Sequence, residues 1–313
     1  MKSIKRLLTI MLSAFMMLSF SGCALITIDG EDNGVVSDYQ GNGSIGLSVS
    51  TQNNPFFVTL VEGAKAAADE AGVQLIVVDA GDDAAKQVSD IEDLIAKKVS
   101  VLIVNPVNSD TVSSVVQDAV NKGVKVISAD RVVNGVEIDC QIASDNVLGA
   151  ELATQFIVDK VGEGAKVAEL QGTSGASAAI DRGTGFHNIA DAKLDVVASQ
   201  PADFDRTKGM TVMENMLQAN GDIKAVFAAN DEMALGAMEA ISASRKKIIV
   251  VGFDATDDAI ASIKDGKMSA TIAQQPDLIG ATAVDTAIKL MNGEEVPASI
   301  PVEVKLVTAE NAG

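Results

Sequence analysis

Polar side chains that could bind a ligand follow the apolar runs of this 313-residue chain, at the points where parallel strands would end. In open α/β sheets, ligands bind outside the carboxyl ends of the strands. Carboxylate and amide oxygens accept hydrogen bonds, whereas arginine and amide N–H groups donate them. A sugar hydroxyl does both, so this mixture predicts a sugar-binding cleft. The residues at these points are Asn105, Asp130, Arg131, Asn230, Asp254 and Gln274, and Arg182 lies near the start of a Gly- and Ala-rich helix.

Aromatic side chains near the same points would provide flat apolar walls for the C–H faces of a sugar ring. Phe56 and Phe57 follow Asn54 at the start of the first predicted helix, and Phe204 lies in a loop further along the chain. Charge-assisted hydrogen bonds are about twice as strong as neutral ones, which would help to replace the water that a sugar sheds. Each position also has a structural explanation: the Asn and Asp residues could be helix caps, Asp130 and Arg131 a surface pair, and the phenylalanines core. Their joint occurrence favours the cleft.

Short apolar runs and amphipathic segments alternate from Ser44 onward, which is typical of βαβ units. Strands that are apolar throughout indicate a parallel sheet buried on both faces. The predicted strands are Ile45–Ser50, Gln74–Val78, Val101–Val104, Val124–Ser128, Lys166–Leu170, Asp195–Ala198, Ala225–Ala228, Ile248–Gly252 and Ser269–Ala273. The predicted helices are Phe57–Ala71, Ala84–Lys97, Thr111–Lys122, Val147–Val161, Arg206–Ala219, Glu232–Ser242 and Leu278–Met291.

Two lobes account for this pattern better than one domain does, because one compact core rarely grows past roughly 250–300 residues. The stretch Asp139–Asn146 alternates apolar and polar residues, unlike the strands around it, and would suit a strand that leaves one lobe for the other. The alternation of strands and helices restarts near Asp145. We therefore predict an α/β fold with two doubly wound parallel-sheet lobes. A single eightfold barrel is the alternative.

Composition excludes several classes of protein. The formal charge is −19, from 24 basic and 43 acidic residues, and such a surface repels the phosphate backbone of nucleic acids. Two cysteines, Cys23 and Cys140, cannot build a disulfide framework, and the single histidine, His187, argues against a structural zinc site. We expect no metal and no nucleic-acid partner, and we expect His187 to pack near Arg182.

Residues 1–22 have the features of a secretory signal peptide, with a basic start followed by the apolar run Leu7–Phe20. That run is shorter than the roughly 20 residues that a membrane-spanning helix needs. Small residues precede Cys23, which resembles a bacterial lipobox in which Phe20 replaces the usual leucine. We predict that Cys23 becomes the lipidated N-terminus and that residues 23–43 form a flexible lipid-anchored tether. A plain signal peptide cleaved nearby is the alternative.

Six segments of the chain carry a family resemblance. They are Ser48–Phe57 (SVSTQNNPFF), Asn105–Asp110 (NPVNSD), Ala143–Gly149 (ASDNVLG), Ser199–Arg206 (SQPADFDR), Asn230–Gly236 (NDEMALG) and Thr271–Pro276 (TIAQQP). Together, and in this order, they resemble the periplasmic sugar-binding proteins that serve bacterial ABC transporters. The resemblance implies a type I periplasmic-binding-protein fold, with two lobes joined by a multi-strand hinge. The N-terminal lobe would comprise residues 44–144 plus 275–303, and the C-terminal lobe residues 145–274 plus 304–313.

The resemblance also implies a complete ligand pocket. Its members would be Asn54, Phe56, Phe57, Asn105, Asp130, Arg131, Arg182, Phe204, Asn230, Asp254 and Gln274, with no departure from the family pattern. The implied ligand is a monosaccharide, a pentose of the ribose type such as D-ribose, with a related sugar such as allose as the alternative. Strands that cross between the lobes are implied near Ser144, Gln274–Gln275 and Val302–Glu303.

The implied function is that of a binding protein without catalytic residue, cofactor or metal, which hands its sugar to an ABC transporter permease. It would act as a monomer outside the cytoplasm. Its lipid anchor would hold it at the outer face of the cytoplasmic membrane, or in the periplasm of a cell with an outer membrane. A chemoreceptor is a further candidate partner.

Two alternative functions make different demands on the sequence. A transcriptional regulator of the LacI type would need a basic helix-turn-helix before the body, where this chain has a signal peptide and an acidic tether. An extracytoplasmic sugar enzyme would use Asp130 and Asp254 for acid–base chemistry. We expect the neighbouring arginines to hold both carboxylates ionised, which disfavours the enzyme.

Overall fold

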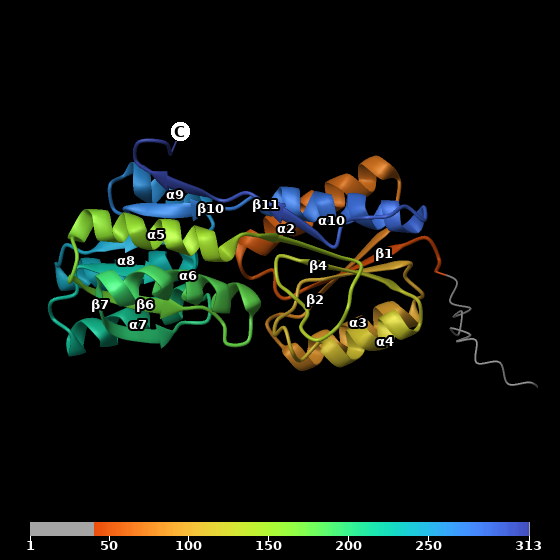
Figure 1. Ribbon diagram of the computed structural model, residues 1–313, viewed down its shortest axis with the longest axis horizontal. Helices are drawn as coiled ribbons and strands as arrows, with labels where there is room; N and C mark the ends of the chain where they lie inside the picture. Colours follow the sequence, from red (N-terminus) through yellow and green to blue (C-terminus); the bar gives the residue numbers. More distant parts are fainter. Residues whose placement is uncertain (1–40, 313) are drawn as a thin grey trace, which may run out of the picture. The chain divides into compact units, whose positions relative to one another are not determined.

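The computed structural model describes residues 41–312. The predicted signal peptide 1–22, the predicted lipidation site Cys23 and the predicted tether as far as residue 40 lie outside the described residues. Residues 41–312 form two six-stranded sheets with helices between successive strands, which appear as two lobes in Figure 1. None of the helices in this part of the chain combines the length and the hydrophobicity that a membrane span requires.

The first sheet is parallel throughout and has the strand order β11-β5-β4-β3-β1-β2. Helices α2 (Pro55–Ala71) and α10 (Pro276–Met291) pack on one face, and helices α3 (Ala84–Ala96) and α4 (Ser113–Asn121) pack on the other (Figure 1). We call this sheet and its helices the N-lobe. Its strands are β1 (Ile45–Val49), β2 (Leu75–Asp79), β3 (Val101–Val104), β4 (Lys125–Ala129), β5 (Cys140–Ser144) and β11 (Ser299–Val302).

Alternate residues of the central strand β3 serve the two faces of this sheet. Val101 and Ile103 pack with α2 and α10, whereas Leu102 and Val104 pack with α3 and α4. Because both faces are buried, every position of the strand must be apolar, which explains the unbroken sequence VLIV.

The second sheet has the strand order β12-β10-β9-β8-β6-β7, in which β12 is antiparallel to β10 and the other pairs are parallel. Helix α5 (Asn146–Val161) packs against α6 (Ser177–Lys193), and α7 (Arg206–Ala219) packs against α8 (Asp231–Ser244), with α9 (Asp257–Lys264) next to α8. We call this sheet and its helices the C-lobe. Its strands are β6 (Lys166–Gln171), β7 (Asp195–Pro201), β8 (Ala225–Ala228), β9 (Ile249–Val251), β10 (Ala270–Ala273) and β12 (Lys305–Thr308).

The chain passes between the two sheets three times, after β5, after β10 and after β11 (Figure 1). The two parallel-sheet α/β lobes confirm the predicted fold class. The alternative of a single eightfold barrel is wrong, because the strands divide between two open sheets.

Four short or irregular elements have no predicted bounds in the sequence analysis: α6, α9, β11 and β12. For α6 only a Gly- and Ala-rich helix near Arg182 is expected, and for β11 and β12 only a crossing near Val302–Glu303. Gly183, Gly185 and His187 interrupt the apolar periodicity of α6. Helix α9 has only eight residues. Strands β11 (SIPV) and β12 (KLVT) lie at the edges of their sheets and are partly exposed, so they lack the unbroken apolar run of the buried strands. Arg182, which the sequence places near the start of a helix, lies in the second turn of α6, since that helix begins at Ser177.

Candidate functional site

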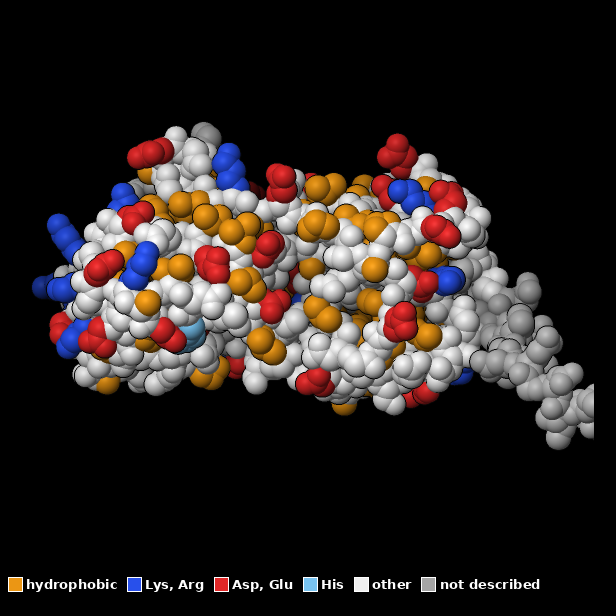
Figure 2. All heavy atoms as spheres, viewed as in Figure 1, with side chains coloured by type: hydrophobic (Ala, Val, Ile, Leu, Met, Phe, Trp, Pro, Cys, Tyr) orange, Lys and Arg blue, Asp and Glu red, His pale blue; other side chains and the backbone are white. Residues whose placement is uncertain are grey.

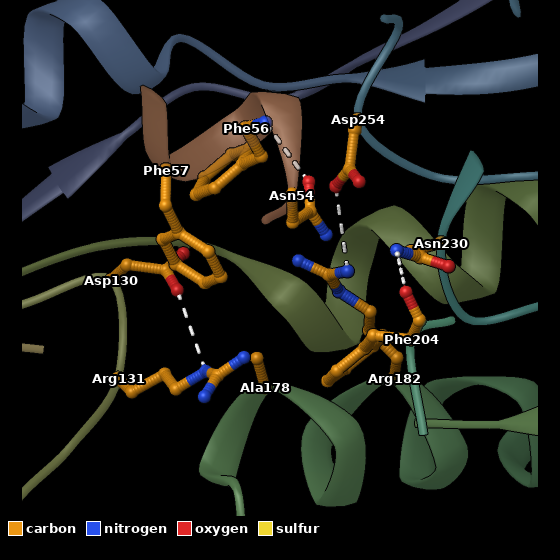
Figure 3. A pocket seen from close by; sticks show the side chains of 10 residues that line it. All are labelled: Asn54, Phe56, Phe57, Asp130, Arg131, Ala178, Arg182, Phe204, Asn230 and Asp254. Carbon is orange, nitrogen blue, oxygen red and sulfur yellow. Dashed lines mark hydrogen bonds and ion pairs between the residues drawn. The ribbon is translucent and has the colours of Figure 1, made fainter. Parts of the chain in front are cut away.

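A cavity lies between the two lobes, at the carboxyl ends of their parallel strands (Figure 3). Its lining consists of nine predicted site residues and Ala178, which lies in the first turn of α6. The structure therefore brings together residues that are as far apart in the sequence as Asn54 and Asp254. The ten lining residues are Asn54, Phe56, Phe57, Asp130, Arg131, Ala178, Arg182, Phe204, Asn230 and Asp254.

The first turn of α2 holds Asn54 and two phenylalanines at the cavity. Asn54 caps the helix, because its Oδ1 accepts a hydrogen bond of 2.9 Å from the backbone N–H of Phe56, and Pro55 is the first helical residue. The cap uses the oxygen, and the amide nitrogen of Asn54 points into the cavity (Figure 3). Phe56 and Phe57 pack edge to face with their ring centroids 5.1 Å apart. One short segment thus supplies a donor and an aromatic wall.

Asp130 and Arg131 follow β4 and are almost completely buried. Oδ2 of Asp130 lies 3.8 Å from Nε of Arg131 and accepts a hydrogen bond of 3.4 Å from Nδ2 of Asn105. Nη1 of Arg131 donates a hydrogen bond of 2.9 Å to the carbonyl oxygen of Pro106. Oδ1 of Asp130 and Nε of Arg131 are buried and have no hydrogen-bond partner. Such atoms are rare in folded proteins, so these two are suited to a polar ligand.

The guanidinium group of Arg131 lies between aromatic rings of the two lobes. Its central carbon is 5.0 Å from the ring centroid of Phe57 in the N-lobe and 5.5 Å from that of Phe204 in the C-lobe. These distances permit cation–π attraction. The ring of Phe204 occupies space that Gly172 leaves open, because a Cβ atom on Gly172 would lie 2.2 Å from Cζ of Phe204. A glycine outside the cavity therefore determines where one aromatic wall can stand.

Contacts within the C-lobe hold Arg182 in place. Its Nε donates a hydrogen bond of 2.8 Å to Oδ1 of Asn146, and its Nη1 donates one of 2.7 Å to the carbonyl oxygen of Ala229. Nη1 also lies 3.5 Å from Oδ1 of Asp254, and the guanidinium carbon lies 3.8 Å from the ring centroid of Phe253. The side chain is therefore positioned at the cavity wall by the protein itself.

Asn230 has a structural role as a helix cap, whereas Asp254 caps no helix. Asn230 caps α8, because its Oδ1 accepts a hydrogen bond of 2.9 Å from the backbone N–H of Met233, so the helix-cap explanation is correct for this residue. Its Nδ2 donates a hydrogen bond of 3.3 Å to the carbonyl oxygen of Phe204, and the residue lines the cavity as well. Asp254 caps no helix, since the residue before α9 is Thr256.

Two predicted site residues, Asn105 and Gln274, do not line the cavity. Oδ1 of Asn105 accepts a hydrogen bond of 2.7 Å from Oγ of Ser50, while its Nδ2 reaches Asp130. Nε2 of Gln274 donates a hydrogen bond of 2.8 Å to Oδ1 of Asp254, and its buried Oε1 has no partner. Each of these amides therefore donates a hydrogen bond to one of the two cavity carboxylates, Asn105 to Asp130 and Gln274 to Asp254.

Burial raises the pKa of both cavity carboxyl groups. It raises the pKa of Asp254 well above its usual value although the charge of Arg182 acts to lower it. It likewise raises the pKa of Asp130 against the charges of Arg131 and Arg182. The neighbouring arginines act to lower both pKa values, as expected from the sequence, but desolvation, which disfavours the charged form, is the larger effect. Hydrogen bonds donated by a ligand to these carboxylates would favour ionisation again.

Three residues around Arg182 escape the sequence analysis. Ala178 brings the first turn of α6 to the cavity, Asn146 accepts from the guanidinium group, and Phe253 packs against it. Asn146 belongs to the segment ASDNVLG and Phe253 immediately precedes Asp254, so both lie next to residues that the analysis does consider. No local pattern distinguishes Ala178 from other small residues of its helix.

His187 does not line the cavity. It is partly exposed on α6 (pale blue in Figure 2), with its Nδ1 2.7 Å from Oδ1 of Asp191 and its Nε2 3.3 Å from Oε2 of Glu169. Partial burial acts to lower the pKa of His187, but the two carboxylates outweigh it and raise the pKa above 6.5. Within residues 41–312, no cluster of His, Cys, Asp and Glu side chains could hold a metal ion, and Cys140 is a buried free thiol.

Comparison with known proteins places this chain among solute-binding proteins. Residues 45–295 match the family described as periplasmic binding protein domain. The ribose import binding protein RbsB of Bacillus subtilis is 56% identical over 265 residues, which cover 85% of this chain and 87% of that protein. The D-allose-binding periplasmic protein of Escherichia coli is 33% identical over 276 residues, covering 83% and 88% of the two chains. An ABC transporter solute-binding protein from Mycobacterium smegmatis, solved with bound glycerol, has a TM-score of 0.83 at 36% identity and covers 87% and 96%.

Proposed function

The chain belongs to the periplasmic binding protein domain family, and from this premise we propose that it binds D-ribose between its lobes and delivers it to an ABC transporter permease. The 56% identity to a ribose import binding protein supports ribose as the ligand. The D-allose-binding relative, at 33% identity, makes a related sugar the alternative.

The observation that carries the proposal is that both lobes present complementary hydrogen-bonding groups to one cavity. The N-lobe supplies Asp130 and Arg131, and the C-lobe supplies Arg182 and Asp254. Sugar hydroxyls can donate to the carboxylates and accept from the guanidinium groups. Oδ1 of Asp130 and Nε of Arg131, which are buried without partners, would both be satisfied by such a ligand.

The charges in the cavity favour a neutral sugar over a phosphorylated one. Two guanidinium groups, on Arg131 and Arg182, are matched by the two carboxyl groups of Asp130 and Asp254. A phosphate group would bring its own charges next to the carboxylates and lower the net attraction. Phe57 and Phe204 face the cavity from opposite lobes and would contact the apolar faces of the ring.

Closure of the lobes follows from where the ligand would lie. A sugar in this cavity would touch both lobes at once, so it would bind the closed arrangement better than an open one and shift the population towards it. Hinge closure around a ligand is an established motion of periplasmic binding proteins. The three passages of the chain between the sheets would form the hinge.

We propose no catalytic step, so the sugar would leave the cavity unchanged. Relatives at 56% and 33% identity are named binding proteins. Two measurements test this function together. Excess ribose, at about a thousand times Kd, should stabilise the protein by roughly 4 kcal/mol. Chromatography after prolonged incubation should recover only ribose, and a new product would instead indicate an enzyme.

Membership of the family implies export from the cytoplasm, and we extend this to a lipid anchor on Cys23. The exported protein would act as a monomer, with a permease as its principal partner and a chemoreceptor as a second candidate. Replacing Cys23 by Ser would remove the acceptor of the lipid and release the protein in soluble form. Cell fractionation tests this, and a variant that stays in the membrane fraction like the parent would contradict the anchor.

A further inference from the structure

The two lobes also contact each other directly beside the cavity, through three hydrogen bonds that involve no ligand. The backbone N–H of Ser109 donates to the carbonyl oxygen of Gly175 at 2.9 Å. The backbone N–H of Ser177 donates to Oγ of Ser109 at 3.2 Å, and the backbone N–H of Val132 donates to Oγ of Ser177 at 2.9 Å. Ser109 and Val132 lie in N-lobe loops after β3 and β4, whereas Gly175 and Ser177 lie at the start of α6 in the C-lobe.

These contacts are closely packed and adjoin the cavity. Ser109 is fully buried and Ser177 is almost so. A Cβ atom on Gly175 would lie 2.0 Å from Nδ2 of Asn108, so no side chain fits between the two loops as they stand. Val132 directly follows the cavity residue Arg131, and Ser177 directly precedes the cavity residue Ala178. Figure 3 shows Arg131 beside Ala178, at the place where the two lobes meet.

The three bonds depend on closure, because each joins a group of one lobe to a group of the other. When the lobes separate, the same donors and acceptors meet water, and folding within each lobe does not require the contact. A hydrogen bond that replaces water contacts still contributes a modest net stabilisation, and a buried donor left without its acceptor is costly. The contact therefore favours the closed arrangement whether or not a sugar is bound.

We propose that Ser109 and Ser177 form an interlobe latch that sets the affinity for the sugar without touching it. The apparent affinity of a ligand depends on how readily the protein reaches its binding-competent state. A weaker latch lowers the population of that state and so weakens binding of every sugar in the same proportion. This inference rests on the proposed function and identifies positioning residues for it.

The variant Ser177→Ala tests the latch, because it removes the acceptor of the Val132 N–H and keeps the backbone of α6. We expect ribose binding to weaken about two- to tenfold, the effect of one lost hydrogen bond. Ser109→Ala, which removes the other side-chain acceptor, should weaken binding by a similar factor. The matched control is Ser244→Ala, since the hydroxyl of Ser244 donates a hydrogen bond of 2.7 Å to the carbonyl oxygen of Ile241 within the C-lobe, away from the latch.

Three readouts separate a latch from a merely structural role. Calorimetry gives the affinities for ribose and allose, whose ratio should stay that of the parent. Scanning calorimetry of the sugar-free proteins should give equal melting temperatures. Hydrogen exchange of the peptide that contains Val132, in sugar-saturated protein, should be faster in Ser177→Ala than in the parent or in Ser244→Ala.

The outcomes distinguish failure of the latch from failure of the proposed function. If the parent binds ribose and Ser177→Ala binds it equally well, the latch is wrong and the function stands. A loss of sugar-free stability in Ser177→Ala as large as its loss of binding would also overturn the latch, because the serine would then support the fold of its own lobe. If the parent binds another sugar but no ribose, the proposed ligand is wrong. The affinities of the parent and the serine variants are then compared for the sugar that does bind. A parent that binds no sugar would overturn both.

Discussion

The guanidinium carbon of Arg131 lies 5.5 Å from the ring centroid of Phe204, so a cation of the N-lobe stands against an aromatic ring of the C-lobe. Neither residue can make this contact unless the lobes are together. The guanidinium group also lies 5.0 Å from the ring of Phe57 in its own lobe, so Arg131 forms part of both walls. A sugar bound beside this pair would contact both lobes, so its binding would favour their closure.

Replacing Arg131 by Ala should weaken ribose binding by about 2–5 kcal/mol, because it removes charge-assisted hydrogen bonds and leaves Asp130 with a poorly compensated charge in the closed cavity. In the sugar-free open form the side chain would face water, so unfolding stability should change by about 1 kcal/mol or less. Calorimetry gives the affinity, and scanning calorimetry gives the stability. Unchanged affinity would place Arg131 outside the site, and a collapse of sugar-free stability would make it structural.

A second arginine provides the control for this variant. Arg206 is partly exposed and pairs with Glu232 and Asp258 within the C-lobe, outside the lining of the cavity. We expect Arg206→Ala to leave the affinity for ribose within about 1 kcal/mol of the parent, the usual range for a surface ion pair.

Replacing Gly172 by Ala should weaken binding although Gly172 does not line the cavity. The new Cβ atom would lie 2.2 Å from Cζ of Phe204, so the ring must move from its place in the cavity wall. Forcing a methyl group into packed space typically costs about 1–3 kcal/mol, and we expect a loss of that order in binding. The control is Gly221→Ala, whose Cβ atom would meet only Nζ of Lys246 at 4.0 Å. Equal affinity of the two variants, measured by calorimetry, would contradict this role of Phe204.

Stability of the sugar-free protein should depend on the protonation of Asp231. This fully buried carboxyl group accepts hydrogen bonds from Thr256 and Thr271, yet burial raises its pKa to about 7. An acid whose pKa is raised by folding stabilises the protein at pH values below its unfolded pKa, near 4, and this stabilisation is lost as the pH rises to about 7. Asp231→Asn should remove this loss.

The measurement is the melting temperature of parent and Asp231→Asn between pH 4 and pH 8. The melting temperature of Asp231→Asn minus that of the parent should rise by several degrees from pH 4 to pH 8. Each kcal/mol of stability moves the melting temperature by roughly 2–4 °C in a domain of 150–250 residues. Asp265→Asn is the control, because Asp265 is exposed and its contact with Lys267 lowers its pKa, so the difference from the parent should not grow above pH 4. A constant difference for Asp231→Asn would show that this carboxyl group does not titrate in the range.

The sequence predicts the lobes and the cavity edge because these depend on local patterns. The unbroken apolar run Val101–Val104 indicates a strand buried on both faces, and the polar residue after each such run marks the edge where ligands bind. What a local pattern cannot give is the direction of each side chain at that edge. Asn105 follows β3 just as the cavity residue Asp130 follows β4. Asn105 does not line the cavity, however, and its amide donates a hydrogen bond to Asp130.

Contacts between residues distant in sequence account for the rest of what sequence analysis misses. The space that Gly172 leaves for Phe204, and the pairing of Ser109 with Ser177 across the lobes, follow from how the loops meet and from no periodicity. The pKa values of the cavity carboxyl groups are a further case. Neighbouring charges can be expected from sequence, whereas the degree of burial, which dominates here, requires the packed structure.

Titration of the purified protein with D-ribose in an isothermal calorimeter, beside allose and a panel of other pentoses and hexoses, tests the central claim most directly. Intrinsic fluorescence would not serve, because the chain has no tryptophan and its single tyrosine, Tyr39, belongs to the predicted tether. We predict one-to-one binding of ribose at submicromolar to micromolar Kd, about −8 to −10 kcal/mol, with allose weaker. A flat titration with ribose, beside heat from another sugar, would contradict the proposed ligand.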